Sequence, residues 1–88
     1  MIKWKLVWTE SSLKDLKKMD KHIAKVIVLK ATNIVENSEI ITDFMKPLKY
    51  SKQGQHRIRI GDYRVICRII HHECIVEAIS IGHRKNIY

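Results

Sequence analysis

HRIRIGDYRVICR, residues 56–68, is the stretch that decides the fold. Two runs of alternating polar and apolar residues meet at Gly61-Asp62, a dipeptide typical of a tight β-hairpin turn. Counting outward from this turn pairs Ile60 with Tyr63 and Arg59 with Arg64. The stretch therefore predicts two antiparallel strands, near 55–60 and 63–70, in one fixed register.

The alternation divides the side chains of this hairpin between two faces. The apolar face carries His56, Ile58, Ile60, Tyr63, Val65, Cys67 and Ile69. The other face carries Arg57, Arg59, Arg64 and Arg68. Arg59 and Arg64 lie directly opposite each other, which weakens a sheet because like charges repel. Stability alone gives no reason to gather four guanidinium groups on one face, so the pattern indicates a bound polyanion.

Length and charge agree with that interpretation. The chain has 88 residues and a net charge of +8, so we expect a single domain, 1–88, with a modest core. Residues 1–45 carry a balance of +2 and residues 46–88 a balance of +6, and all five arginines fall in the second part. Clustered arginine suits bidentate recognition of phosphate, which favours a nucleic-acid partner.

Several other classes are not expected. The amino terminus has no apolar leader, and no apolar run approaches the ~20 residues of a membrane span, so a cytoplasmic protein without a membrane partner is predicted. Two cysteines, Cys67 and Cys74, favour reduced thiols over a disulfide framework. His71, His72 and Glu73 form a polar connection between strands, and we expect no metal and no cofactor.

Before the hairpin, the pattern predicts a strand and two helices. In residues 2–8 the side chains of Ile2, Trp4, Leu6 and Trp8 share one face, and those of Lys3, Lys5 and Val7 share the other. The tryptophans fit a core better than a platform for bases. Thr9 is a candidate N-cap for a helix to about Met19, with Leu13 and Leu16 facing inward.

Asp20 is the candidate cap of the second helix, which runs to about Asn37. Its apolar stripe consists of Ile23, Ile27, Ala31 and Ile34, widened by Val26, Leu29, Lys30 and Val35. Residues 38–54 are expected to form a loop, since Pro47, Gly54 and scattered polar residues interrupt any pattern.

A last strand near 74–81 completes the expected fold. This fold is α+β, a four-stranded antiparallel sheet with a helical hairpin on one face and an open basic face on the other. The last register stays open. A turn at His72-Glu73 would place Glu77 opposite Arg68, with Ile75, Ile79 and Ile81 on the arginine face. A three-residue turn would instead bury those isoleucines together with Glu77.

Five segments carry a resemblance to a known family. They are Trp8-Thr9, LKDLKK (13–18), KPLK (46–49), RIRIGDYRV (57–65) and ISIGHRKNIY (79–88). In these segments, which span nearly the whole chain, the sequence resembles the RelE/ParE toxins of type II toxin–antitoxin modules, with the RelE-like branch the nearer. Members of that branch are ribosome-dependent endoribonucleases that cut mRNA and inhibit translation. Members of the ParE branch share the fold and inhibit DNA gyrase, and that non-enzymatic alternative stays open.

The resemblance implies metal-independent cleavage, in which the neighbouring 2′-hydroxyl attacks the phosphorus. Arg57 and Arg59 stand where RelE members carry basic strand residues, often lysine. Arg64 and Arg84 match the arginines assigned to the scissile phosphate, and Tyr88 matches a terminal tyrosine that contacts a base or assists proton transfer. Further basic residues are expected to bind RNA: Lys49, Lys52, Arg68 and Lys85.

One departure concerns the general base. A guanidinium stays protonated at any physiological pH, so Arg57 and Arg59 cannot easily replace a catalytic lysine. The remaining candidates are His83, His56 and Tyr88. His56 falls on the apolar face and is expected in the core, whereas His83 adjoins Arg84 and imidazole suits proton transfer near neutral pH. The implied partners are mRNA on the ribosome and a cognate antitoxin, small and acidic, that covers the basic face.

Overall fold

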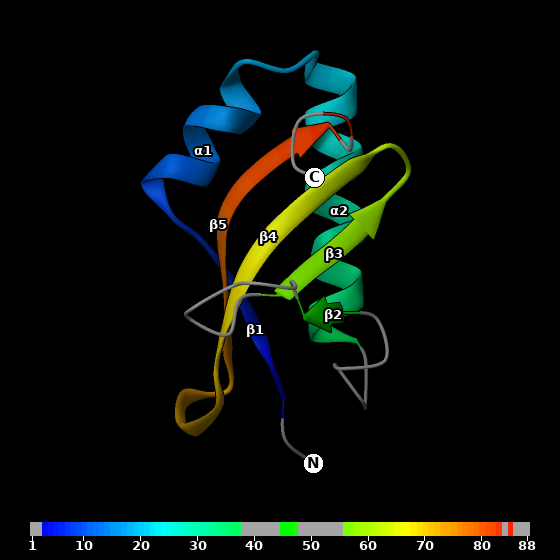
Figure 1. The fold of residues 1–88 in the computed structure, drawn as a ribbon. Coiled ribbons are helices and arrows are strands. Elements are labelled where there is room, and N and C mark those ends of the chain that lie inside the picture. The colour runs from blue at the N-terminus through cyan, green and yellow to red at the C-terminus, as the bar shows by residue number, and fades with distance from the viewer. Residues whose placement is uncertain (1–2, 38–44, 48–55, 84, 86–88) are drawn as a thin grey trace.

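The computed structural model describes residues 3–37, 45–47, 56–83 and 85 of the chain (Figure 1). Its elements in chain order are β1 (Lys5–Trp8), α1 (Glu10–Lys17), α2 (Lys21–Glu36), β2 (Met45–Pro47), β3 (His56–Ile60), β4 (Tyr63–Ile70), a 3₁₀ turn (His71–Glu73) and β5 (Ile75–His83). The α+β class is confirmed. Neither helix in the described part is long and apolar enough to cross a membrane.

The sheet of the described residues has the strand order β1-β5-β4-β3-β2. Its β2–β3, β3–β4 and β4–β5 pairs are antiparallel, but β1 runs parallel to β5. The prediction of a purely antiparallel sheet was therefore wrong at β1, because the long connection from β1 to β5 permits a parallel crossover. The prediction of a loop over 38–54 was also wrong in part. Met45–Pro47 pairs with β3 as an edge strand, a position that accepts proline.

The predicted register of the β3–β4 hairpin is confirmed. Ile60 pairs with Tyr63 and Arg59 with Arg64, and the pairing continues to His56 and Cys67. Gly61 has a φ of 57°, as the first central residue of a primed hairpin turn requires. The turn chemistry therefore determines which side chains of the hairpin share a face.

The β4–β5 pair resolves the register that the sequence left open. Arg68 pairs with Glu77, as a turn at His72-Glu73 requires. Between Ile66 and Cys67 the register shifts, since Ile66 pairs with Ser80 and Cys67 with Ala78. Ile79 is the extra residue of this β-bulge, and a bulge reverses the alternation beyond it. Ile81 therefore enters the core, although it was predicted on the arginine face in this register.

The core lies between α2 and one face of the sheet. Ile27, Ala31 and Val35 of α2 are buried together with sheet residues such as Ile58 and Val76, and Figure 1 shows α2 behind the sheet. The caps predicted at Thr9 and Asp20 are confirmed by hydrogen bonds from the first turns of α1 and α2.

Two leucines predicted to face the core are exposed instead. Leu29 is 60% exposed because it lies two residues from both Ile27 and Ala31, about 200° around the helix from each. Leu13 is 45% exposed, and the neighbouring Ser12 is buried in its place. Leu16 packs against the core as predicted.

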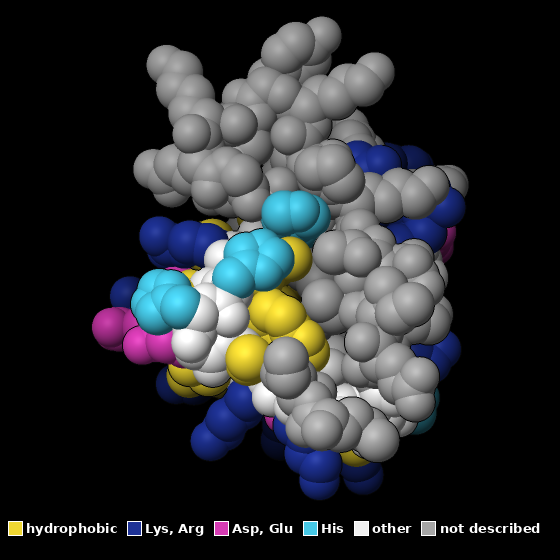
Figure 2. Space-filling model, turned by 90° about the horizontal axis from the view of Figure 1, so that it is seen from below, with side chains coloured by type: hydrophobic (Ala, Val, Ile, Leu, Met, Phe, Trp, Pro, Cys, Tyr) yellow, Lys and Arg dark blue, Asp and Glu magenta, His cyan; other side chains and the backbone are white. Residues whose placement is uncertain are grey.

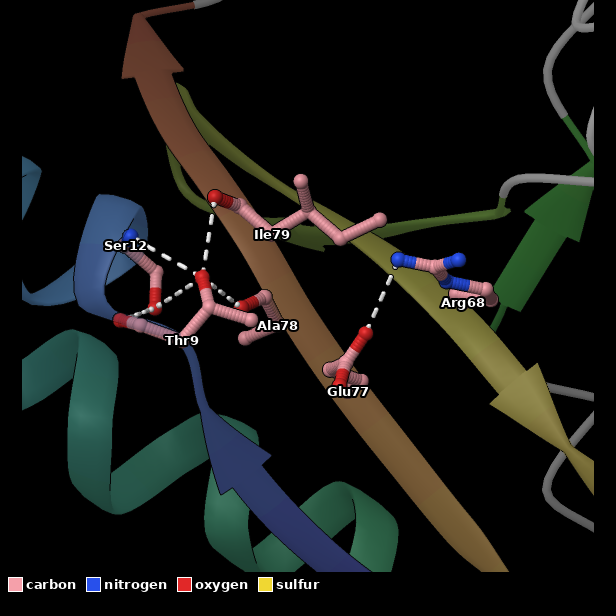
Figure 3. A network of polar contacts seen from close by, with 6 residues as sticks. All are labelled: Thr9, Ser12, Arg68, Glu77, Ala78 and Ile79. Atoms are coloured by element: carbon pink, nitrogen blue, oxygen red, sulfur yellow. Dashed lines mark hydrogen bonds and ion pairs between the residues drawn. The ribbon is translucent and has the colours of Figure 1, made fainter.

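Ser12 is buried because α1 is held to the edge of β5 by polar contacts (Figure 3). The pairing of β1 with β5 ends at Trp8 and Ala78. Beyond this point the Thr9 hydroxyl donates to the Ala78 carbonyl at 2.8 Å, and the Ile81 N–H donates to an Asp15 carboxylate oxygen at 2.9 Å. These contacts satisfy β5 backbone groups that would otherwise form an open sheet edge.

Candidate functional site

The outer face is the sheet face opposite α2, and it carries the arginines. Arg57, Arg59, Arg64 and Arg68 alternate with the buried residues of β3 and β4, so their predicted sharing of one face is confirmed. Arg59 is exposed and Arg57 is half-buried. The backbone therefore gathers four guanidinium-bearing residues within two adjacent strands.

Arg64 does not have the exposed position expected of a residue opposite another arginine. It is only 3% exposed. Its Nη1 donates to the Gly61 carbonyl at 3.0 Å and to the Tyr63 carbonyl at 2.9 Å. The guanidinium thus folds back onto the hairpin turn, where two backbone oxygens hold it. This arrangement gives Arg64 a structural role.

Arg68 forms an ion pair with Glu77 on the neighbouring strand. The two side chains approach to 3.0 Å and are 47% and 28% exposed, respectively, and Figure 3 shows them meeting across the β4–β5 pair. Because both are partly solvated, the ion pair adds little to stability. It does reduce the net positive charge that Arg68 offers to an anion.

The two histidines considered for proton transfer lie on the helix side of the sheet. β5 extends to His83, which pairs with Tyr63. Their rings contact edge to face, with centroids 5.5 Å apart, and the His83 Nδ1 accepts from the Lys85 N–H at 3.3 Å. The sequence predicted the strand end near Ile81. Because the strand continues by two residues, alternation turns His83 away from the arginines.

His56 pairs with Cys67 on the apolar face, as predicted. Its Nδ1 is buried and has no hydrogen-bond partner in the described part of the chain. Burial raises the pKa of the neighbouring Cys67 thiol to about 12, so this thiol stays protonated at neutral pH and is a poor nucleophile. Neither group contributes chemistry to the outer face.

The remaining predicted site residues divide into two groups. Lys85 is exposed. Arg84, Tyr88, Lys49 and Lys52 lie outside the described residues, so their assignments stay predictions.

Lys5 is a basic residue of the outer face that the sequence did not identify. The parallel register pairs Lys5 with Ile75 and Val7 with Glu77, while Leu6 pairs with the buried Val76. Lys5 therefore shares a face with Glu77 and Arg68. The alternation had separated Lys5 from the tryptophans, but it could not reveal which strand lies beside β1.

The described residues offer two further features, a pocket beside α2 and an apolar patch with neighbouring histidines. A pocket of about 240 Å³ lies between α2 and the β3–β4 turn, with Val26, Ile27 and Tyr63 among its walls. No group of three or more His, Cys, Asp or Glu side chains within residues 3–37, 45–47, 56–83 and 85 could hold a metal ion. Figure 2 shows histidine side chains beside an apolar patch in the view from below. The rings of Trp4 and His71 contact edge to face, with centroids 5.9 Å apart.

Comparison with protein families gives one match over most of the chain. Residues 6–88 match the model of the ParE toxin of the type II toxin–antitoxin system parDE. No curated protein sequence matches the chain.

Solved structures with a similar fold come from several organisms. The RelBE2 toxin–antitoxin complex of Mycobacterium tuberculosis matches with a TM-score of 0.82 at 24% identity, covering 94% of this chain and 100% of that one. The RelB–RelE complex of Methanococcus jannaschii matches with a TM-score of 0.66 at 27% identity, covering 93% and 94%. The YoeB/ParE toxin of Agrobacterium tumefaciens matches with a TM-score of 0.63 at 25% identity, covering 90% and 96%.

Proposed function

We propose that this chain, which belongs to the ParE toxin family of type II toxin–antitoxin systems, is a ribosome-dependent endoribonuclease that cuts mRNA and stops translation. The observation that carries this proposal is the gathering of Arg57, Arg59 and Arg64 on one sheet face. A protein that only inhibits gyrase needs no such cluster of guanidinium groups.

The proposed reaction needs charge stabilisation more than it needs a strong nucleophile from the protein. The 2′-oxygen of the substrate attacks the adjacent phosphorus, the bond from phosphorus to the 5′-oxygen breaks, and a 2′,3′-cyclic phosphate forms. Negative charge grows on the phosphoryl oxygens in the transition state, where donors already held in position are most effective. The exposed Arg59 fits the role of the donor that contacts the phosphate. Arg64 is only 3% exposed and is held by the Gly61 and Tyr63 carbonyls, so its role is to supply a fixed positive charge close to that donor.

Proton transfer must come from elsewhere. The 2′-hydroxyl loses a proton and the leaving 5′-oxygen gains one, yet His83 and His56 both lie on the helix side of the sheet. We therefore assign the protonation of the leaving oxygen to Tyr88, with Arg84 on the phosphate, and the alignment of the 2′-hydroxyl to the ribosome. The proton that the 2′-hydroxyl loses passes to a solvent water molecule. Alignment alone accelerates such reactions by a large factor, so naked RNA should be cut slowly.

The proposal includes a cognate antitoxin. Two of the similar structures are complexes of a toxin with its antitoxin, and the net charge of +8 calls for an acidic partner. We expect a small acidic protein encoded next to this chain that binds the toxin in the cytoplasm. Sequencing the adjoining reading frame tests this part directly.

The alternative is a ParE-type inhibitor of DNA gyrase. The family model that matches the chain is named for ParE, and this observation favours the alternative. Expression of the toxin without its antitoxin separates the two functions. The enzyme produces mRNA ends inside translated codons within minutes, while the inhibitor leaves mRNA intact and causes DNA breaks that depend on gyrase.

Variants sharpen this experiment. Arg59→Ala should lose cleavage on programmed ribosomes while remaining folded, because Arg59 is exposed. Tyr88→Phe should be slower by about 10²–10⁴-fold if its hydroxyl transfers a proton. The endoribonuclease proposal would be refuted if the wild type and Arg59→Ala both caused gyrase-dependent DNA breaks and both left mRNA intact.

A further inference from the structure

The outer face extends well beyond the arginine cluster. Figure 1 places the β3–β4 turn at one end of the sheet and the start of β1 at the other. From Arg64 to Ile70 along β4, six residues cover about 20 Å. Ile70 pairs with Ile75, and Ile75 pairs with Lys5, so Lys5 lies two strands across from that point. The basic residues therefore form a diagonal band across the sheet.

The composition of this band is uneven. Arg57, Arg59 and Arg64 stand at one end, Arg68 stands in the middle, and Lys5 stands at the other end, with the exposed Lys3 two residues before it. Glu77 lies in the band, directly between Arg68 and Val7 in the pairing. The arginine end suits bidentate contacts, whereas lysine offers a mobile point charge. Such a charge suits a phosphate backbone that is held but not cleaved.

We propose that Lys5, with the neighbouring Lys3, forms a second phosphate-binding subsite at the β1 end of the outer face, which holds the backbone of single-stranded RNA away from the cleaved linkage. The inference rests on the proposed function, because it takes the arginine cluster as the place of cleavage. The two basic groups lie on the same sheet face, at opposite ends of the band, and this spacing favours RNA over a protein partner. A single strand carries one charge per nucleotide and can follow the diagonal from Arg59 past Arg68 to Lys5.

Glu77 allows a second test, in which the expected change in RNA affinity is opposite to that for Lys5. An RNA strand that follows this diagonal passes the Arg68–Glu77 ion pair. Glu77 repels the phosphates and competes with them for Arg68. Removing its charge should therefore strengthen binding of any RNA long enough to reach it, while removing the charge of Lys5 should weaken binding of the same RNA.

The experiment measures binding of 2′-O-methyl oligonucleotides, which lack the nucleophile and cannot be cleaved. Fluorescence anisotropy compares oligomers of about three and about ten nucleotides. Lys5→Ala should weaken binding of the longer oligomer about three- to tenfold at low salt and reduce its salt slope by about 0.7, the loss of one phosphate contact. Glu77→Gln should strengthen it about two- to fivefold. Neither variant should change binding of the shorter oligomer.

Matched controls account for net charge. Lys25 on α2 and Glu10 on α1 are exposed, so Lys25→Ala and Glu10→Gln make the same charge changes away from the outer face. Effects of Lys5→Ala and Glu77→Gln no larger than these controls would overturn the subsite. If the subsite is overturned in this way but Arg59→Ala still weakens binding of both oligomers, the proposed function stands. No binding of either oligomer by the wild-type protein would overturn both RNA assignments.

A protein partner is the other outcome. A poly-glutamate peptide of comparable charge serves as the probe in the same assay. If Lys5→Ala weakens binding of the peptide and leaves binding of the longer oligomer unchanged, the β1 end binds an acidic protein segment and the RNA subsite is refuted.

Discussion

Replacing Arg64 by alanine should destabilise the protein strongly, although the residue faces away from the core. The side chain is 3% exposed, and its Nη1 donates to two carbonyls of the β3–β4 turn. Hydrogen bonds from a charged donor contribute about 1.5–3 kcal/mol each to stability, so the two together represent roughly 3–6 kcal/mol. Their loss would also leave the Gly61 and Tyr63 carbonyls without this donor.

One effect opposes this loss. Arg59 and Arg64 are directly paired, and removing one of two like charges relieves about 0.2–1 kcal/mol of repulsion. The lost hydrogen bonds are larger than this gain, so we expect a net destabilisation of about 2–5 kcal/mol. For a domain of this size each kcal/mol lowers Tm by about 4–8 °C. Arg64→Ala should therefore melt roughly 8–40 °C below the wild type.

Thermal and urea denaturation of the purified protein measure this loss of stability. Two further variants show which interaction causes it. Arg64→Met keeps most of the side-chain packing and removes the donors, so it should lose nearly as much stability as Arg64→Ala. Arg59→Ala should be neutral or slightly stabilising, because Arg59 is exposed and opposes a like charge. A Tm of Arg64→Ala within about 3 °C of the wild type, less than 1 kcal/mol, would refute the reasoning.

Three further predictions concern stability. Because burial raises the Cys67 pKa from 9.0 to about 12, the folded state favours the neutral thiol. Relative to Cys67→Val, the free energy of unfolding should therefore fall by about 1.4 kcal/mol per pH unit as the pH rises from 9.0 towards about 12. Parallel urea-denaturation pH profiles of the two proteins would contradict this. Cys74 has a φ of 55°, so Cys74→Gly should gain about 0.5–1 kcal/mol in urea denaturation, and Cys74→Ala should gain nothing. Thr9→Val removes the α1 cap and the contact to Ala78 and should lose about 1–2 kcal/mol by the same assay, whereas the exposed Ser11→Ala should not.

What the sequence predicted well depends on short-range rules. The register of β3 with β4 follows from one two-residue turn and strict alternation, so Arg59 and Arg64 could be paired without a structure. The caps at Thr9 and Asp20 follow from a side-chain oxygen placed before a helical pattern. In each case, a few residues that are neighbours in the sequence determine the local structure.

The sequence-based predictions were wrong where the structure depends on residues far apart in the chain or on the conformation of a single side chain. The neighbour of β1 depends on where the long connection brings the chain back, and no local pattern contains that information. The bulge at Ile79 reverses the alternation of β5, so the same isoleucine-rich segment serves the core at Ile81 and the outer face at Glu77. For Arg64, alternation gave the correct face but not the side-chain conformation, because two turn carbonyls compete with solvent for the guanidinium.

The position of Arg64 connects folding with the proposed catalysis. The same side chain holds the turn that sets the register of the arginine face and supplies a fixed positive charge to the proposed site. A positive charge fixed by backbone carbonyls need not reorganise when negative charge develops on the substrate, and this is the condition under which electrostatic stabilisation is largest. Loss of toxicity in Arg64→Ala would thus mix a folding defect with a chemical one. Arg59, exposed on the adjacent strand, is the residue whose removal tests the chemistry alone.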